Sequence, residues 1–490
     1  MARFRESPIA PDILGLNYYL TSDRYLDDRL DRYPRETHGG NGRIRYADVD
    51  AVRARPGGIA GHEAHLLSAW RRYRIPLAMT EVHLGCTREE QMRWLSESWK
   101  AAERARARGT DVRAVTAWAL LGSFNWDSLV TRDEGHYEPG VFDVRGSAPR
   151  PTALAGVVTS LAASDTPQHP ALDGVPWWRR PERLIDTPAA RSLHLGAGAS
   201  PLLIVGSTGT LGQAFHRICE QRGLAAHLAG RQEVDITDPA RVDAILRRLQ
   251  PWAVINAAGY VRVDAAEQDA DACRRANVIG PMNLAAACRR RGVPLLTFSS
   301  DLVFDGRAGR AYLEDDEPAP LNVYGATKAE AEQRVLALLP ESLVVRTSAF
   351  FGPWDEYNFL AALFRALDAG TPFAAPTDSV VSPTYVPDLV HASLDLLIDR
   401  ERGIWHLAND GAISWFDFAC IAARRSVRPV DLITPVETAR MWGPAVRPQY
   451  SALSSSRARL LRPLEEALRA FVQEGPQPRV ATGTEGCASH

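Results

Sequence analysis

The sequence predicts an α/β protein whose C-terminal half is a doubly wound parallel sheet. From Pro201 onward, short apolar runs rich in β-branched residues alternate with amphipathic helical stretches. A glycine-rich turn joins the first of these runs to a helix, as in nucleotide-binding α/β domains. With 490 residues the chain is also too long for one ordinary core, so at least two domains are expected.

Four apolar runs are predicted to be buried parallel strands because each is short and bounded by turn residues. They are LLIV (202–205), AVINAA (253–258), PLLTFSS (294–300) and SLVVRTS (342–348). Helices are expected between them, at PARVDAILRRLQ (239–250) and GPMNLAAACRRRG (280–292). The C-terminal domain is placed at 200–472, with a small substrate-binding lobe expected beside the sheet, and a disordered tail is placed at 473–490.

Composition excludes several functional classes. The hydrophobic content is 45%, the charged content 24% and the net charge −2, so the sequence shows no basic footprint for nucleic acid. No apolar run approaches the roughly 18 residues that suggest a membrane helix. The six cysteines form no CxxC pair, which favours reduced thiols and a cytoplasmic, soluble protein.

Residues 166–199 are rich in Pro and Arg and are predicted to be a linker that follows an N-terminal segment, 1–165.

The glycine-rich turn has the spacing GxxGxxG, with Gly206, Gly209 and Gly212. Glycines allow a tight turn and a close backbone approach to a pyrophosphate, and the helix N-terminus adds free N–H groups. A Rossmann-type dinucleotide site is therefore expected here. The next strand ends in Gly230-Arg231, and Arg231 can meet a 2′-phosphate, which favours NADPH while leaving NADH open.

Lys328 is one of only two lysines among 57 basic residues, and it follows Tyr324 by four positions. This spacing places both side chains on one face of a helix. With Ser300 at a strand end, they form the Ser–Tyr–Lys arrangement that resembles short-chain dehydrogenases/reductases. Tyr324 is the expected acid for a ketone reduction, Lys328 is expected to lower its pKa, and Ser300 to position the carbonyl oxygen.

Residues from about 201 to 470 resemble the dTDP-4-dehydrorhamnose reductase family, an extended branch of that superfamily. The resemblance rests on INAAGYVRVDAAE (255–267), SSDLVFDG (299–306), PLNVYGATKAEAE (320–332), VVRTSAFFG (344–352), SPTYVPDL (382–389) and RPQYSAL (447–453). It implies reduction of the C4 ketone of dTDP-4-dehydro-L-rhamnose by NADPH or NADH.

The resemblance also implies site residues. The cofactor would be held by Gly206, Gly209, Thr210, Leu211, Gly212, Arg231, Asp235, Ile236, Ala257, Ala258, Gly259, Tyr324 and Lys328. The substrate would meet Ser300, Asp301, Val303 and Ala349. Ala349 replaces a tryptophan of the family, a loss of contact worth on the order of 1–3 kcal/mol that Phe350 or Trp354 can offset. Ala214 replaces a glutamate that binds Mg²⁺ in some relatives, so no metal is expected.

Residues 12–157 resemble the C-terminal portion of family-1 glycoside hydrolases, a TIM-barrel family. The matching stretches are GLNYY (15–19), IPLAMTEVHLG (75–85), AWALLGSFNW (117–126) and GVFDV (140–144). The resemblance implies that Glu81 corresponds to the nucleophile, contacted by Tyr18 or Tyr19, with Trp118 and Trp126 beside the sugar. The family's glycone-binding glutamate is Asn125 here.

A retaining glycosidase needs a second carboxylate, and no Asn-Glu-Pro motif that would supply it occurs. About 160 residues also cannot close a barrel of about 250. The prediction is a partial TIM-barrel-like segment, either a truncated barrel or a relic, whose exposed strand edges favour a homodimer or docking on the other half. Two functional alternatives stay open: a non-catalytic binding protein, or a reductase of another nucleotide 4-keto-6-deoxysugar.

Overall fold

The computed structural model describes residues 11–185, 199–441 and 443–475. They form two compact units. Unit 1 comprises Met1–Val144 and Ala148–Ala199, and unit 2 comprises Arg145–Ser147 and Ser200–His490.

Unit 2 is built on a six-stranded parallel sheet, in the order β12-β11-β13-β14-β15-β20. The strands are β11 (Leu202–Val205), β12 (Ala226–Ala229), β13 (Ala253–Asn256), β14 (Leu295–Phe298), β15 (Leu343–Arg346) and β20 (Gly403–His406). Every residue of the four central strands is buried, as expected when helices cover both faces of a parallel sheet. The predicted Rossmann-type sheet is confirmed.

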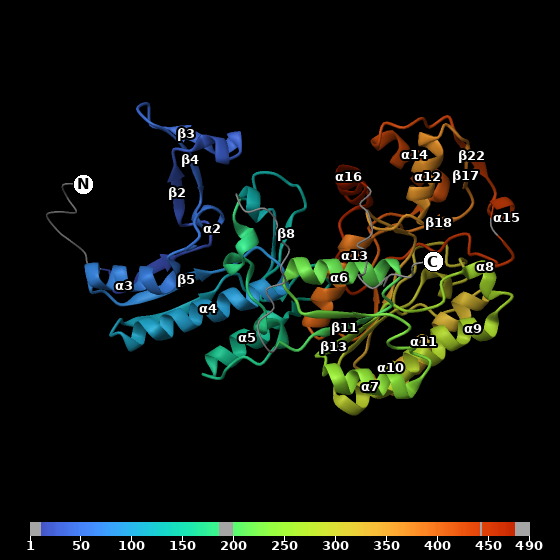
Figure 1. The fold of residues 1–490 in the computed structure, drawn as a ribbon, viewed down its shortest axis with the longest axis horizontal. Coiled ribbons are helices and arrows are strands. Elements are labelled where there is room, and N and C mark those ends of the chain that lie inside the picture. The colour runs from blue at the N-terminus through green and yellow to red at the C-terminus, as the bar shows by residue number, and fades with distance from the viewer. Residues whose placement is uncertain (1–10, 186–198, 442, 476–490) are drawn as a thin grey trace, which may run out of the picture. The chain divides into compact units, whose positions relative to one another are not determined.

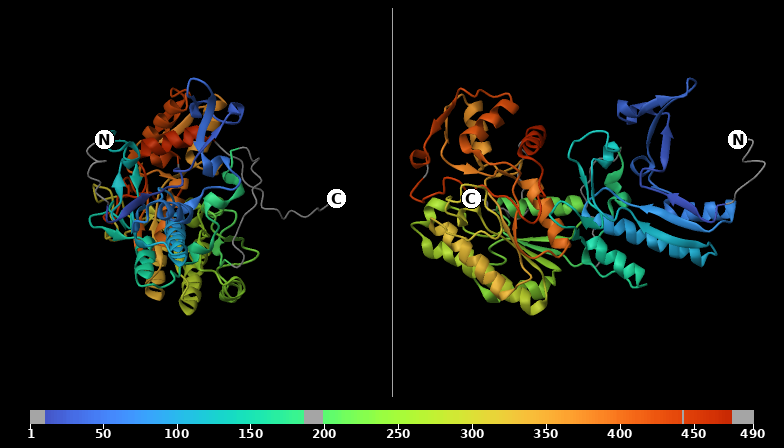
Figure 2. Two further views of the ribbon diagram at one scale, coloured as in Figure 1. Left: turned by 90° about the vertical axis from the view of Figure 1, so that its left-hand side faces the viewer. Right: turned by 180° about the vertical axis from the view of Figure 1, so that it is seen from behind.

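Helices lie on both faces of this sheet (Figure 1). On one face α6 (Thr210–Arg222) packs against α13 (Val386–Ile398). On the other, α10 (Gly280–Arg291) packs between α7 (Pro239–Leu249) and α11 (Val323–Leu338), and Figure 2 shows this layer from behind in green and yellow. The shorter helices near α10 are α8 (Val263–Ala266), α9 (Ala270–Arg274) and the π-helix η7 (Arg275–Ile279).

The chain passes from β11 to its neighbour β12 and then crosses to β13 on the opposite side of β11. Ligands of open α/β sheets bind at such a reversal, beyond the carboxyl ends of the strands. The sheet order therefore directs attention to the loops that follow β11 and β13.

A small lobe completes unit 2. It contains three two-stranded pairings, β16 (Phe350–Phe351) with β19 (Thr384–Tyr385), β17 (Phe373–Pro376) with β22 (Ile433–Val436), and β18 (Val380–Val381) with β21 (Ile413–Ser414). Its helices are α12 (Phe359–Asp368), α14 (Trp415–Arg425), α15 (Thr438–Met441) and α16 (Leu464–Glu474). A buried aromatic cluster of Phe351, Phe418 and Phe471 holds the lobe together.

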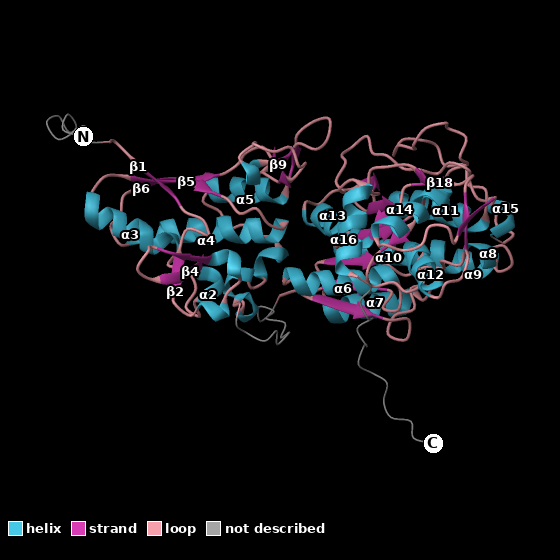
Figure 3. Cartoon of the chain, turned by 90° about the horizontal axis from the view of Figure 1, so that it is seen from above, coloured by secondary structure: helices cyan, strands magenta, loops and turns pink. Residues whose placement is uncertain are grey.

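Unit 1 contains a three-stranded parallel sheet, in the order β1 (Leu14–Asn17), β5 (Leu77–Val82), β6 (Val112–Ala117). Helices α3 (Gly61–Tyr73) and α4 (Arg88–Ala107) connect these strands, and Figure 3 shows them alongside the sheet. Strand–helix alternation is present, but three parallel strands do not establish a partial barrel.

The remaining elements of unit 1 are short. They are β2 (Arg24–Asp27), β3 (His38–Gly40), β4 (Arg45–Asp50), β7 (Ser123–Phe124), β8 (Tyr137–Glu138), β9 (Phe142–Asp143), β10 (Arg150–Pro151), α2 (Ala51–Ala54) and α5 (Ala153–Ala162).

The predicted linker, 166–199, differs from a free connection where it is described. Residues 170–183 form three 3-10 turns, and Trp178 is buried edge-on against Trp94 at 5.3 Å. Residues 186–198 of the linker lie outside the described residues. So does most of the predicted tail, from 476 onward, while its first two residues, 473 and 474, end α16.

Candidate active site

The glycine-rich turn follows β11 and leads directly into α6. Gly206 has a φ of +112°, and a Cβ there would lie 2.7 Å from backbone atoms of Ala257, so only glycine fits. A Cβ on Gly212 would lie 2.0 Å from the carbonyl oxygen of Gly206. The turn is therefore pressed against the loop after β13.

A cavity of about 610 Å³, here called the glycine-loop cavity, opens beside this turn. Eight of the predicted cofactor residues line it: Gly206, Gly209, Arg231, Asp235, Ile236, Ala257, Ala258 and Gly259. Three others, Thr210, Leu211 and Gly212, form the first turn of α6 and are not among its lining residues. Thr210 instead donates its hydroxyl to Asp355, at 2.9 Å.

Arg231 and Asp235 both line the glycine-loop cavity and are hydrogen-bonded to each other. The hydroxyl and backbone N–H of Thr237 lower the pKa of Asp235, as does Arg231, whose Nε lies 3.1 Å from the carboxylate. The Arg231 side chain is 86% exposed, so its guanidinium keeps most donors free for an added anion.

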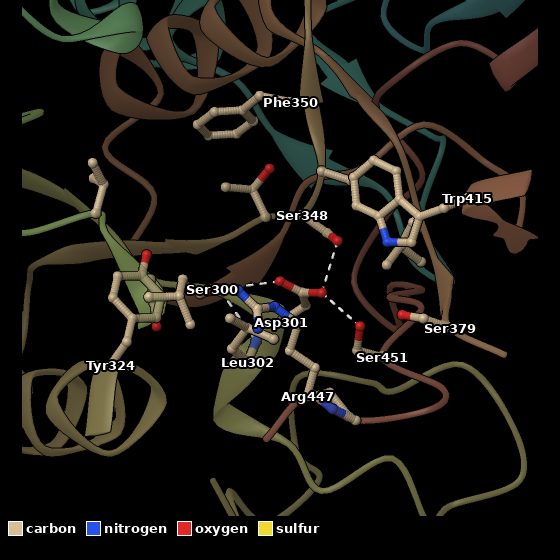
Figure 4. Close-up of a pocket in the computed structure, with 17 residues that line it drawn as sticks. Ser300, Asp301, Leu302, Tyr324, Ser348, Phe350, Ser379, Trp415, Arg447 and Ser451 are labelled. Carbon is tan, nitrogen blue, oxygen red and sulfur yellow. Dashed lines mark hydrogen bonds between the residues drawn. The ribbon is translucent and has the colours of Figure 1, made fainter. Parts of the chain in front are cut away.

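A second cavity of about 380 Å³, here called the Tyr324 cavity, lies beyond the ends of β14 and β15 (Figure 4). Four predicted residues line it: Ser300, Asp301, Tyr324 and Ala349. Val303, predicted to meet the substrate, is fully buried in a small core with Phe304 and Tyr312, and its neighbour Leu302 lines the cavity instead. Trp354 does not line it, whereas Phe350 does.

Tyr324 and Lys328 lie on the first turns of α11, which Asn322 caps by accepting the N–H of Gly325 at 2.7 Å. The Lys328 ammonium lies 5.7 Å from the centre of the Tyr324 ring and donates to the carbonyl oxygen of Phe298, at 3.0 Å. The helix thus brings the phenol and the ammonium together, as their spacing predicted.

Burial dominates the pKa shifts of Tyr324 and Lys328 on α11. Burial raises the pKa of Tyr324 and the nearby Asp301 carboxyl adds to the rise, while a hydrogen bond with Ser300 opposes it; that Lys328 lowers this pKa stays a prediction. Burial also lowers the pKa of Lys328 to about 8. Loss of hydration is the largest cause of both shifts, and the ammonium has Phe298 as its hydrogen-bond acceptor.

Asp301 is buried at the wall of the Tyr324 cavity and forms hydrogen bonds with three serine hydroxyls. Its Oδ1 lies 3.0 Å from Ser300 Oγ, and its Oδ2 lies 2.8 Å from Ser348 Oγ and 2.6 Å from Ser451 Oγ. These serines come from three distant parts of the sequence, and only Ser300 was predicted. Burial raises the pKa of Asp301, and the hydroxyls of Ser451, Ser348 and Ser300 oppose the rise.

Asn277 was missed by the sequence-based reasoning. It lies in the π-helix η7, accepts the backbone N–H of Tyr260 at 2.7 Å and donates to the Tyr260 carbonyl oxygen at 3.0 Å. Its Nδ2 also lies 3.3 Å from the hydroxyl of Thr327 on α11. The residue therefore links the loop of the glycine-loop cavity to the helix of Tyr324, and π-helical turns are frequent at functional sites.

Trp415 and Arg447 also line the Tyr324 cavity and were not predicted. Trp415 begins α14 and packs against Phe359 at 4.6 Å, which holds the indole in place at the cavity wall. Arg447 binds both carboxylate oxygens of Asp264, at 2.9 and 2.7 Å. No local pattern marks either residue, because each reaches the cavity from a separate part of the small lobe.

In unit 1, Tyr19 donates its hydroxyl to Glu81 at the end of β5. Tyr18 instead donates to Asp23 at 3.0 Å and is buried. Trp118 and Trp126 lie near each other, with ring centres 5.9 Å apart.

Ala214, at the position predicted to lack a metal ligand, is buried within α6. Across the described ranges, no group of three or more His, Cys, Asp or Glu side chains is placed to hold a metal ion. Within the same ranges, no helix is both long and apolar enough to cross a membrane.

Comparison with known proteins places unit 2 in a family. Residues 200–475 match the family described as the RmlD substrate binding domain. A dTDP-4-dehydrorhamnose reductase of Streptomyces griseus is 34% identical over 282 residues, which are 56% of this chain and 92% of that protein. The chain belongs to the dTDP-4-dehydrorhamnose reductase family.

Two further relatives bear on the site. A dTDP-4-keto-6-deoxy-D-glucose reductase of Streptomyces niveus is 32% identical over 279 residues, 56% of this chain and 96% of that protein. A crystal structure of dTDP-4-dehydrorhamnose reductase from Bacillus anthracis in complex with NADP is 30% identical, with a TM-score of 0.53, and covers 56% of this chain and 99% of that one. The predicted family resemblance is thus confirmed for unit 2, while the resemblance of residues 12–157 to glycoside hydrolases stays a prediction.

Proposed function

We propose that unit 2 is an NADPH-dependent reductase that converts the C4 ketone of dTDP-4-dehydro-L-rhamnose into the hydroxyl of dTDP-L-rhamnose. The observation that carries the proposal is the Tyr324 cavity. Its wall holds the phenol of Tyr324 and the hydroxyl of Ser300, and Lys328 lies one helical turn behind the phenol. A ketone oxygen that gains charge needs such a proton donor within hydrogen-bonding reach.

The nicotinamide supplies the hydride when it is bound. The glycine-loop cavity fits its dinucleotide because Gly206 and Gly212 have no Cβ, which allows the backbone of the turn to approach a pyrophosphate closely. Tyr324 gives its hydroxyl proton to the oxygen of the substrate. Its raised pKa keeps that proton in place at neutral pH, so the residue enters the reaction as an acid. Lys328 offsets the charge left on the phenolate.

NADPH is the proposed cofactor, with NADH as the weaker alternative. Arg231 supports this choice because it lines the glycine-loop cavity next to Asp235 and its side chain is exposed. A 2′-phosphate would gain charge-assisted hydrogen bonds there, whereas a plain ribose hydroxyl would not.

The test is consumption of NADPH with dTDP-4-dehydro-L-rhamnose, comparing wild type with Tyr324→Phe. Loss of the acid should lower kcat by about 10²–10⁴-fold, while NADPH binding is retained. Tyr73→Phe makes the same change at a half-exposed ring on α3 and should leave kcat unaltered. If Tyr324→Phe stays within threefold of wild type, the residue is not the acid.

A second nucleotide sugar is the alternative substrate. Ala349 lines the Tyr324 cavity and offers a methyl group where the family has an indole, while Phe350 and Trp415 supply the aromatic surface. One relative is named for dTDP-4-keto-6-deoxy-D-glucose, so that compound is the first to compare. A higher kcat/KM for it would replace the proposed substrate, and NADPH binding without turnover of either would favour a binding protein.

For unit 1 we propose descent from a family-1 glycoside hydrolase without its activity. The Tyr19–Glu81 hydrogen bond at the end of β5 supports this origin. We also propose domain boundaries at 1–165, 166–199 and 200–472. The two compact units divide at 199/200, and the short segment Arg145–Ser147 also belongs to unit 2. The test is hydrolysis of an aryl glucoside by the wild-type chain and by Glu81→Gln. Hydrolysis by wild type that is absent in Glu81→Gln would contradict the proposal that unit 1 has lost glycosidase activity.

We also propose that unit 1 mediates a homodimer. Strands β1 and β6 each pair only with β5 among the described strands, so each presents an unpaired edge. A monomeric mass for the full chain in sedimentation at micromolar concentration would contradict this. We place the enzyme in the cytoplasm, supported by the five free cysteines of the described chain.

A further inference from the structure

Ser300 has one hydroxyl hydrogen, for which the Asp301 carboxyl, the Tyr324 oxygen and a bound carbonyl oxygen compete. Its oxygen already accepts the backbone N–H of Leu302, at 3.2 Å, and it lies 3.0 Å from Asp301 Oδ1. If Asp301 is ionised, its oxygen draws the Ser300 hydrogen downward, away from the cavity. Ser300 then has no donor left for a carbonyl oxygen bound above it.

The other two serines are arranged differently. Ser348 and Ser451 both approach Oδ2 of Asp301, at 2.8 and 2.6 Å. Two donors on one oxygen suit the carbonyl oxygen of a neutral carboxylic acid. The second oxygen, Oδ1, is then the one that carries the hydrogen, and Ser300 Oγ is the acceptor that faces it (Figure 4).

The surroundings of Asp301 contain little that would hold a negative charge. Its side chain is buried, and it forms no salt bridge with any Arg, Lys or His of the described residues. The titratable or charged groups that line the same cavity are Tyr324 of α11, a neutral phenol, and Arg447, which is paired with Asp264. Among the described residues, three neutral hydroxyls and its own backbone N–H form its hydrogen bonds. Burial, which raises the pKa of Asp301, acts in the same direction.

We propose that Asp301 is a positioning residue that works as a neutral acid and donates its hydrogen to Ser300, which frees the Ser300 hydroxyl to donate to the carbonyl oxygen of the substrate. No bond is formed or broken at Asp301, and the proton that the product gains still comes from Tyr324. The inference rests on the proposed reductase function and adds to it a required protonation state.

Three variants separate this role from a structural one. Asparagine at 301 keeps the shape, accepts from Ser348 and Ser451 through its oxygen and donates to Ser300 through its amide. Asp301→Asn should therefore keep kcat within about tenfold of wild type. Asp301→Ala removes the donor to Ser300 and should lose about 100-fold, close to Ser300→Ala, as for the loss of one oxyanion donor. Asp301→Asn as inactive as Asp301→Ala would overturn the proposal.

The pH dependence gives a second readout. The neutral acid is present below the pKa of Asp301 and is lost as the pH rises through it, so kcat of wild type should fall there. Asp301→Asn cannot ionise and should lack this decline, keeping only a fall due to Tyr324. An identical profile for both proteins would refute the required protonation state.

Infrared spectroscopy tests the protonation state without turnover. The difference spectrum between wild type and Asp301→Asn at neutral pH should contain the carbonyl band of a protonated carboxyl group. Asp305→Asn is the matched control, because hydrogen bonds and Arg307 lower the pKa of Asp305 and its band should be absent. Lack of the band for Asp301 overturns the proposal. A wild type that shows the band but reduces neither sugar tells against the proposed function only.

Discussion

Replacing Lys328 by methionine should stabilise the protein while it removes activity. Among the described residues, the ammonium has one hydrogen bond, to Phe298, and no carboxylate within salt-bridge distance, although the Glu332 charge acts on it from farther away. Burial lowers the pKa of Lys328 from 10.5 to about 8, and the difference corresponds to about 3 kcal/mol of cost to the folded state near pH 7. Methionine avoids that cost but leaves the carbonyl of Phe298 without its donor, a loss of about 1 kcal/mol. The expected gain in the free energy of unfolding is about 2 kcal/mol.

The sign of the pH dependence follows from the lowered pKa. Between about pH 8 and 10.5 the unfolded chain still binds the proton that folded Lys328 has released, so the unfolding free energy of wild type rises with pH. The advantage of Lys328→Met is therefore full near pH 7. It should shrink by about 1–2 kcal/mol when the pH is raised to about 9.5.

The assay is urea denaturation at both pH values, following the transition that added NADPH shifts, because the two units need not unfold together. Lys100→Met is the matched control: it changes the only other lysine, at an exposed position of α4, and should alter stability by less than about 0.5 kcal/mol. A Lys328→Met variant that is less stable than wild type near pH 7 would refute the reasoning. It would mean that the ammonium is held by interactions stronger than its loss of hydration.

Three other predictions follow from single contacts. Gly212→Ala should abolish NADPH binding, measured by fluorescence titration, because its Cβ would lie 2.0 Å from the Gly206 oxygen; an unchanged Kd would contradict this. Arg231→Ala should weaken NADPH binding by about tenfold and leave NADH binding unaltered, since only a 2′-phosphate needs the guanidinium; equal losses for both cofactors would point to a structural effect. Glu332→Ala should destabilise unit 2 by about 3–5 kcal/mol in the same denaturation assay, because it leaves the buried Arg346 unpaired, and a change below 1 kcal/mol would disprove that pairing.

The glycine spacing and the alternation of apolar and amphipathic runs determined the α/β fold of unit 2 from sequence, because turn geometry and side-chain periodicity are local properties. The same holds for Tyr324 and Lys328, since a spacing of four on one helix fixes their neighbourhood. In unit 1 the segments 15–19 and 75–85 predicted strands and a contact of Tyr18 or Tyr19 with Glu81. The sequence alone did not decide how many parallel strands would assemble.

Tertiary structure alone decided the environment of the site. Asp301, Ser348 and Ser451 are separated by up to 150 residues, and only the packing of the small lobe onto the sheet joins their hydrogen bonds. Burial likewise set the pKa directions of Tyr324 and Lys328, because these depend on how much water the folded chain excludes from each group. Local patterns encode backbone conformation, whereas loss of hydration and long-range pairing depend on which side chains the folded chain encloses.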